Sequence, residues 1–143
     1  SPWLPYPARA DLYAAADLLV SICSEGLETE LAYRTRLLDA AWGGVPSVSV
    51  GGGTLARELS QAGAAFECAR DAGQLARSVS GVLADAPRRG AAGAAARAFA
   101  ASRSWQAVTA PLSDWCRDAR VDPGRLPVPA GDGIGERLKN LFR

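Results

Sequence analysis

In the first two thirds of the chain, the pattern of hydrophobic and polar positions consists of short apolar segments that alternate with longer amphipathic ones. Short apolar runs at 18–23, 46–50 and 64–68 predict three strands, and the first run is apolar enough to be buried on both faces of a parallel sheet. Longer amphipathic segments predict helices at 9–16, 28–42, 54–62 and 71–83. This alternation favours an α/β fold with a doubly wound parallel sheet. Three strands are few for such a sheet, so we expect further strands upstream of Ser1.

Residues with strong positional preferences support these boundaries. Gly43 and Gly44, followed by Pro46, are typical of the end of the helix at 28–42. Thr54 is a suitable N-cap for the third helix, and Asp71 is a suitable N-cap for the fourth.

The last third of the chain has a different composition. Alanine-rich and amphipathic patterns predict helices at 91–101 and 105–117, the second of them packed, before a linker rich in Pro, Gly and Asp at 122–135. We therefore expect an N-terminally incomplete domain at 1–118, followed at 119–143 by a linker and a short amphipathic helix at 134–142. The apolar side of that last helix, with basic residues beside it, suits a membrane surface or the missing part of the protein.

Composition excludes several kinds of chemistry. The 143 residues contain no histidine, which excludes Ser-His-Asp triads, Cys-His pairs and histidine-ligated metals, and we expect no metal site. A net charge of +1 gives no basic surface for nucleic acid. Three widely spaced cysteines, an odd number, without a signal peptide favour a reducing, cytoplasmic compartment. No apolar run has membrane-spanning length. Because the sequence begins at Ser1 without methionine, we expect it to be part of a longer protein.

Two loops are placed where an open parallel sheet binds ligands, beyond the carboxyl ends of its strands. The first, at 23–29, contains Glu25, Gly26 and Thr29, and the second, at 51–54, contains Gly52, Gly53 and Thr54. Each leads from a strand into the start of a helix, where free N–H groups and the helix dipole favour an anion.

The predicted helix at 28–42 carries the densest group of charges in the chain. Arg34 lies on the same stripe as Leu31 and Leu38, and Glu30, four residues earlier, is its expected partner. Glu28 and Asp39, eleven residues apart, return to one helix face at a separation of about 16 Å. That spacing suits the two ends of an extended ligand such as a nucleotide sugar, whereas a simpler interpretation is a set of surface salt bridges.

Three segments together resemble the C-terminal domain of the GT-B glycosyltransferases, in their large retaining group. They are 12–21, Glu28–Glu30 and 34–46. The family's helix carries two glutamates separated by seven residues and ends in Gly-x-Pro, which Gly44-Val45-Pro46 matches. Asp39 falls at the second glutamate, and the resemblance implies that it contacts the ribose. The first glutamate would fall at Leu31, so the resemblance implies Glu28 or Glu30 as the residue that holds the donor sugar, and leaves open which.

Two further segments extend the resemblance over about 3–115. The run 51–54, with Glu58 after it, is similar to the family's Gly-Gly turn. The segment from Trp3 to Tyr6 resembles the one that borders the nucleobase, although these aromatic residues are equally suited to closing the edge of the sheet.

The resemblance implies a partial Rossmann-like sheet followed by helices, and retaining transfer of a hexose from a UDP- or GDP-sugar. The acceptor would be a glycan, a lipid-linked molecule or a small molecule, as in cell-envelope polysaccharide biosynthesis, and no cofactor would be needed. Arg34 and Arg36 are the nearby cations that could steady the leaving diphosphate. The acceptor domain would lie in the enzyme's N-terminal half, so we expect the isolated chain to be inactive, in the cytoplasm or at the inner face of the membrane.

Two other functions remain open from the sequence. A non-catalytic scaffold, degenerate at Leu31, would bind no nucleotide and would tolerate changes at Glu28, Glu30 and Asp39. A sugar-nucleotide epimerase would share the same architecture.

Overall fold

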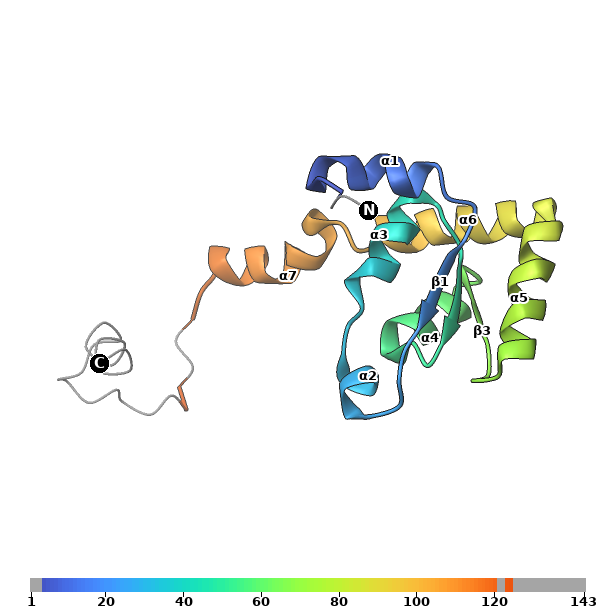
Figure 1. Cartoon of the computed structure of the whole chain (residues 1–143). Coiled ribbons are helices and arrows are strands. Elements are labelled where there is room, and N and C mark those ends of the chain that lie inside the picture. The colour runs from blue at the N-terminus through green and yellow to red at the C-terminus, as the bar shows by residue number, and fades with distance from the viewer. Residues whose placement is uncertain (1–3, 121–122, 125–143) are drawn as a thin grey trace. The chain divides into compact units, whose positions relative to one another are not determined.

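The computed structural model describes residues 4–120 and 123–124. The chain divides into two compact units, 1–108 and 109–143, and each is treated by itself. The first unit is a mixed α/β structure whose small, open sheet contains three parallel strands in the order β1-β2-β3 (Figure 1). The fold class predicted from the alternation of segments is confirmed at this level.

The three strands lie close to their predicted positions. They are β1 (Leu19–Ile22), β2 (Ser47–Val50) and β3 (Ala65–Glu67). Leu19 is paired with Ser47, and Ser47 with Ala65, so these side chains share one face of the sheet. All four residues of β2 are buried because this strand lies between the other two.

The first strand is not buried on both faces, and this prediction is wrong. Val20 is 42% exposed and Ile22 is 63% exposed. Both point to the same face as Val48, which α5 (Ala72–Ala84) covers over β2 and β3 but not over β1. The apolar side chains of Val20 and Ile22 thus lie on a part of the sheet that no described helix covers.

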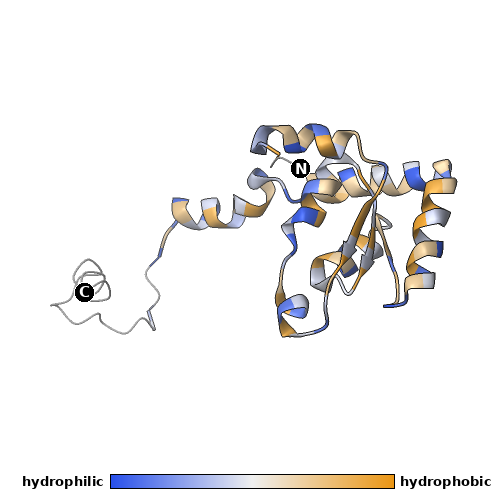
Figure 2. Cartoon of the chain, in the orientation of Figure 1, coloured by the Kyte–Doolittle hydropathy of each residue, from blue (hydrophilic) through white to orange (hydrophobic). Residues whose placement is uncertain are grey.

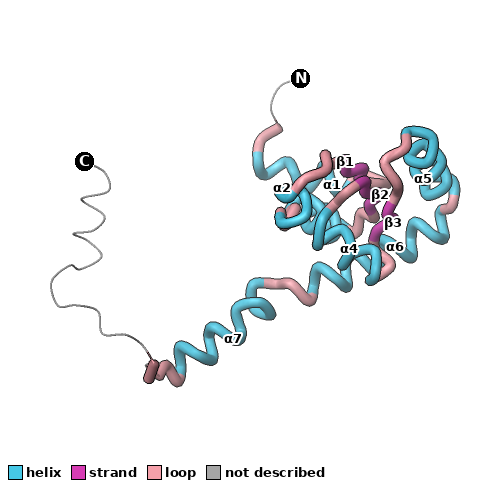
Figure 3. The backbone as a smooth tube through the Cα atoms, turned by 90° about the horizontal axis from the view of Figure 1, so that it is seen from below, coloured by secondary structure: helices cyan, strands magenta, loops and turns pink. Residues whose placement is uncertain are grey.

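The remaining helices of the first unit surround the sheet (Figure 3). After a short 3-10 turn at Tyr6–Ala8, they are α1 (Arg9–Ala14), α2 (Leu27–Leu31), α3 (Thr35–Gly43), α4 (Gly53–Gln61) and α6 (Ala86–Ala101). The main core lies where α3, α4 and α6 meet one sheet face, around Leu37, Leu59 and Phe99. Figure 2 shows the helices as amphipathic ribbons, with apolar residues concentrated in the strands and on helix faces.

The helix predicted over 28–42 is two helices. Residue Ala32 is extended, with φ −70° and ψ 126°, and Arg34 precedes the first turn of α3. The interruption separates Leu31, which is 81% exposed, from the buried face of α3. Glu28 and Asp39 therefore belong to different helices, and their predicted placement along one helix face is wrong.

Helix caps agree with the sequence in one case and differ in another. Asp71 caps α5 as predicted, since its Oδ1 accepts from the Gln74 N–H at 2.7 Å. Thr54 is not the N-cap of α4: Gly52 holds that position, and the helix begins at Gly53. The helix predicted at 91–101 begins earlier, at Ala86, because the Asp85 carboxylate accepts from the Arg88 N–H at 2.9 Å.

The structure describes only part of the C-terminal segments predicted after residue 104. Helix α7 (Trp105–Arg117) has the predicted bounds, and it spans the boundary between the two units after Val108. Most of the linker and the whole helix predicted at 134–142 lie outside the described residues. Over the described part of the chain, no helix combines the length and apolarity needed to cross a membrane.

Candidate functional site

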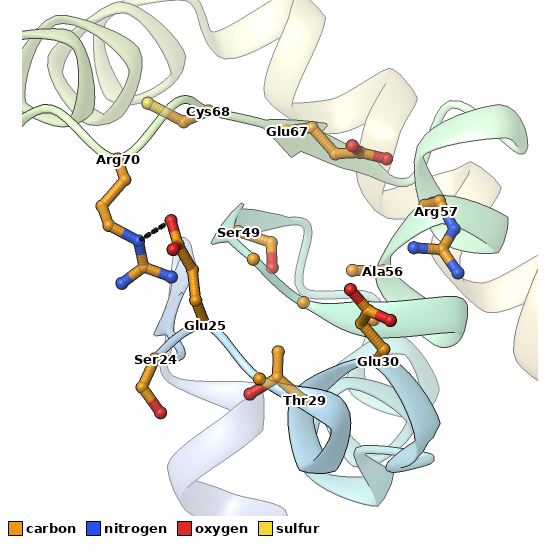
Figure 4. A pocket seen from close by; sticks show the side chains of 14 residues that line it. Ser24, Glu25, Thr29, Glu30, Ser49, Ala56, Arg57, Glu67, Cys68 and Arg70 are labelled. Atoms are coloured by element: carbon orange, nitrogen blue, oxygen red, sulfur yellow. Dashed lines mark ion pairs between the residues drawn. The ribbon is translucent and has the colours of Figure 1, made fainter.

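A polar pocket lies at the carboxyl ends of the three strands, and we call it the strand-end pocket. Its lining comes from 24–30 after β1, from 49–57 around the end of β2, and from 67–70 at the end of β3 (Figure 4). The hollow measures about 230 Å³. Parallel strands bring these three loops to one edge of the sheet, which is where open α/β sheets bind ligands.

Glycines allow two helices to begin close together at this edge. Gly53 has φ +69°, and a methyl group on it would overlap the carbonyl oxygen of Thr29 in α2. A methyl group on Gly52 would overlap the Ser49 hydroxyl and the Ala56 side chain. Both glycines are buried, so close packing of α4 against α2 and β2 already explains their small size.

The pocket carries acids and arginines together. Glu25 forms an ion pair with Arg70 at 3.3 Å, and Arg70 also donates to the carbonyl oxygen of Cys23. The carboxylates of Glu30 and Glu67 are exposed at the pocket. Such a lining offers acceptors for hydroxyl groups and guanidinium donors for anionic or carbonyl oxygens.

Six residues predicted as site residues meet in this pocket, five from the two loops and Glu30 from the predicted helix at 28–42. They are Glu25, Gly26, Thr29, Glu30, Gly52 and Gly53. Thr54 is exposed in the first turn of α4 and is not part of the lining, and its Oγ1 accepts from Arg57 at 3.3 Å. Trp3 lies outside the described residues.

A second hollow, the β1 groove, follows the first strand and is lined by 19–23 and 32–37. It contains Arg34 and Arg36 and measures about 620 Å³. Arg34 pairs with Glu28 at 2.8 Å, not with Glu30 as predicted, because the interruption between α2 and α3 turns it back toward the start of α2. Arg34 also donates to the Thr29 hydroxyl at 3.1 Å, which links the groove to the strand-end pocket.

Asp39 lies apart from both hollows, on an exposed face of α3 near α1. Its charge contributes to a raised pKa of Tyr13, after the larger effect of burial, whereas Arg9 and Arg36 lower that pKa. The structure therefore brings Asp39 close to Tyr13 and away from Glu25 and Glu30.

Reasoning from the sequence missed four polar or charged residues of the pocket, as well as Ala56 and Cys68. Ser49, Arg57, Glu67 and Arg70 all line it. The rule that led to the two loops, polar residues at the carboxyl end of a parallel strand, also applies to the third strand and would have identified Glu67 and Arg70. Ser49 and Arg57 give no such signal, because they lie inside a strand and a helix. Among the described residues, no three His, Cys, Asp or Glu side chains are grouped closely enough to hold a metal ion.

Fold and pocket together define a mixed α/β protein with an open parallel sheet and a polar site at its carboxyl edge. The chain matches no protein-family model, no curated protein and no solved structure.

Proposed function

We propose that this chain is the donor-binding domain of a retaining GT-B glycosyltransferase, with a partial Rossmann-like sheet. It would bind a nucleotide sugar, such as a UDP- or GDP-sugar, for transfer to a glycan, lipid-linked or small acceptor. The observation that carries the proposal is the strand-end pocket, which brings Glu25, Thr29 and Glu30 together with the start of α4 at the carboxyl edge of parallel strands.

Contacts in the pocket favour Glu30 over Glu28 as the acid that holds the donor sugar. The Glu28 carboxylate accepts from Arg34 at 2.8 Å and does not line the strand-end pocket. Glu30 lines the pocket, and its carboxylate points into the pocket in Figure 4. A carboxylate of this kind accepts hydrogen bonds from sugar hydroxyls.

The cations for the leaving diphosphate would be Arg34 and Arg36. Both line the β1 groove, and Arg34 reaches the pocket through Thr29. Guanidinium groups placed where negative charge develops stabilise the transition state of such a transfer. Three free cysteines agree with our placing of this activity in the reducing cytoplasm.

Calorimetry with UDP and GDP tests the proposal on the 143-residue chain. We expect weak binding of at least one nucleoside diphosphate and no turnover of a nucleotide sugar by the isolated chain. Asp39→Ala should weaken binding if this carboxylate contacts the ribose, and Asp11→Ala, which removes an exposed acid from α1, should not.

Two results would count against the proposal in different ways. Equal binding by Asp39→Ala and by the unaltered chain would remove the ribose assignment and leave the remaining site. Absence of binding by any nucleotide, with the chain folded by circular dichroism, would favour a non-catalytic scaffold.

A further inference from the structure

A third hollow follows the outer edge of β3, and we call it the β3 groove. All three residues of β3 line it, together with Ser60 of α4 on one side and Ser78, Gly81 and Val82 of α5 on the other. It measures about 470 Å³, and Figure 1 shows β3 at the edge of the sheet, next to α5. Helices α4 and α5 lie on opposite faces of the sheet, so the groove exposes the edge of the strand and not only one face.

The backbone of β3 offers hydrogen-bonding groups to this groove. The Cys68 N–H donates to the Ser49 carbonyl oxygen at 2.9 Å and so points toward β2. Backbone groups of successive residues in a strand point to opposite edges, so those of Glu67 and Ala65 point away from β2. No other strand pairs with β3 among the described residues. Such a row of outward N–H and C=O groups is a template for a further strand.

Two arginines give this edge a positive charge. Arg77 of α5 and Arg88 of α6 line the groove and are exposed, and neither forms an ion pair with another described residue. The Arg88 guanidinium lies 4.5 Å from the centre of the Phe66 ring, which holds it above β3. Against these two cations the lining contains one acid, Glu67. The groove therefore favours a partner with acidic side chains.

A glycine keeps the α5 side of the groove low. Gly81 lies inside α5, where glycine is a weaker helix former than alanine. A methyl group on Gly81 would meet no atom within 4 Å, so packing among the described residues does not require glycine here. Glycine allows another backbone to approach closely. An extended segment between β3 and α5 gives this position a physical reason.

We propose that the β3 groove binds an extended, acidic segment of another protein, which joins the sheet as a fourth strand beside β3. Its backbone pairs with the outward groups of Ala65 and Glu67, as in other complexes formed by strand addition. The inference goes beyond the proposed function and does not depend on it, because the β3 groove and the strand-end pocket share only Glu67.

Charge decides how this segment lies. Phe66 pairs with Val48 and points to the sheet face that α5 covers, and both groove arginines lie on that side. Side chains alternate between the two faces of a strand, so acidic residues at every second position of the added strand meet Arg77 and Arg88. A second copy of this chain is a poorer occupant, because pairing two β3 edges would bring four arginines together.

Fluorescence anisotropy tests the inference on the 143-residue chain, with a fluorescein-labelled hexapeptide of alternating valine and glutamate as the probe. We expect saturable binding that weakens as the salt concentration rises. Replacing every glutamate of the peptide by glutamine should weaken binding about fivefold or more. A peptide N-methylated along its backbone cannot donate to the strand edge and should show no saturable binding.

Charge variants of the protein test the arginines. Arg77→Gln and Arg88→Gln, combined in one chain, should weaken binding of the glutamate peptide about fivefold. Arg9→Gln is the control: it removes a charge from an exposed arginine of α1 that does not line the groove, so binding should change less than about twofold.

Gly81→Ala separates binding from folding. The methyl group fills space that the added strand needs, so binding should weaken about fivefold, while the urea midpoint should rise because alanine favours the helix. Gly90→Ala is the matched control. Gly90 also lies inside a helix, α6, with no atom within 4 Å of an added methyl group, but it does not line the groove. This variant should raise the midpoint similarly and leave binding unchanged.

Nuclear magnetic resonance locates the contact. The amide signals of Ala65 and Glu67 should shift when the glutamate peptide is added. Equal binding of the glutamine or N-methylated peptide would overturn the inference, and so would unchanged binding by a folded Gly81→Ala chain. If these amide signals shift with protein concentration alone and the peptide adds nothing, the edge pairs with a second copy, and the inference is overturned.

Discussion

Tyr13 shows how a single side chain can depend on partners that the sequence does not reveal. It lies in α1 against Gly43 at the end of α3, and burial raises the pKa of its phenol above the ordinary value of 10.0. The nearby Asp39 charge raises this pKa further, while Arg9 and Arg36 act in the opposite direction. The sequence placed Asp39 on one helix face with Glu28, but the residue whose pKa its charge raises, Tyr13, belongs to another helix.

The raised pKa makes a prediction for alkaline pH. In the unfolded chain, tyrosine ionises near pH 10, whereas the folded protein holds the Tyr13 proton to higher pH. The stability that this protonated phenol contributes is therefore complete below about pH 10 and is lost as pH rises through the folded pKa. Urea denaturation at pH 8 and pH 11 should show a smaller alkaline loss of stability in Tyr13→Phe than in the unaltered chain. Tyr6→Phe, at a position 78% exposed, should behave like the unaltered chain, and equal losses in all three proteins would contradict the prediction.

The interruption between α2 and α3 shows what periodicity along one helix cannot predict. Every residue from Glu28 to Trp42 is compatible with a helix, and the pattern of Leu31, Leu38 and Ala41 suggested one continuous face. In the fold, the Thr29 carbonyl packs on Gly53 of α4, and Arg34 turns back to Glu28 and Thr29. These contacts join residues distant in sequence or arise only after the chain has turned, so local propensity could not identify them.

Gly53 provides a test of this packing. Alanine at this position would adopt φ +69° and would also overlap the Thr29 carbonyl oxygen, so we expect Gly53→Ala to destabilise the protein by about 2 kcal/mol or more. Gly63→Ala is the matched control, because Gly63 has φ +74° but open space around its Cα. It should cost about 1 kcal/mol from backbone strain alone. Urea denaturation measures both free energies of unfolding, and equal losses would show that the contact with α2 contributes nothing.

At the scale of the whole molecule, topology was easier to predict than the site. Alternating segments predicted a parallel sheet, and a parallel sheet requires the loops after its strands to lie along one edge. For that reason the loop residues Glu25, Thr29 and Gly52 meet in one pocket as predicted, together with Glu30. The predicted positions of Arg34, Arg36 and Asp39 assumed one continuous helix. That helix is interrupted in the fold, and these three residues lie outside the strand-end pocket.

Part of the sheet is left uncovered at β1. Val20 and Ile22 leave an apolar strip on β1, and no strand pairs with the outer edge of β1 among the described residues. An exposed apolar edge strand without lysine or proline favours association between copies of a chain. Sedimentation velocity should therefore show self-association of the 143-residue chain that increases with concentration, and Ile22→Lys should reduce it several-fold. Leu12→Lys adds the same charge at an exposed leucine on α1 and should reduce association much less. If both variants reduce it equally, net charge and not the edge of β1 controls the association.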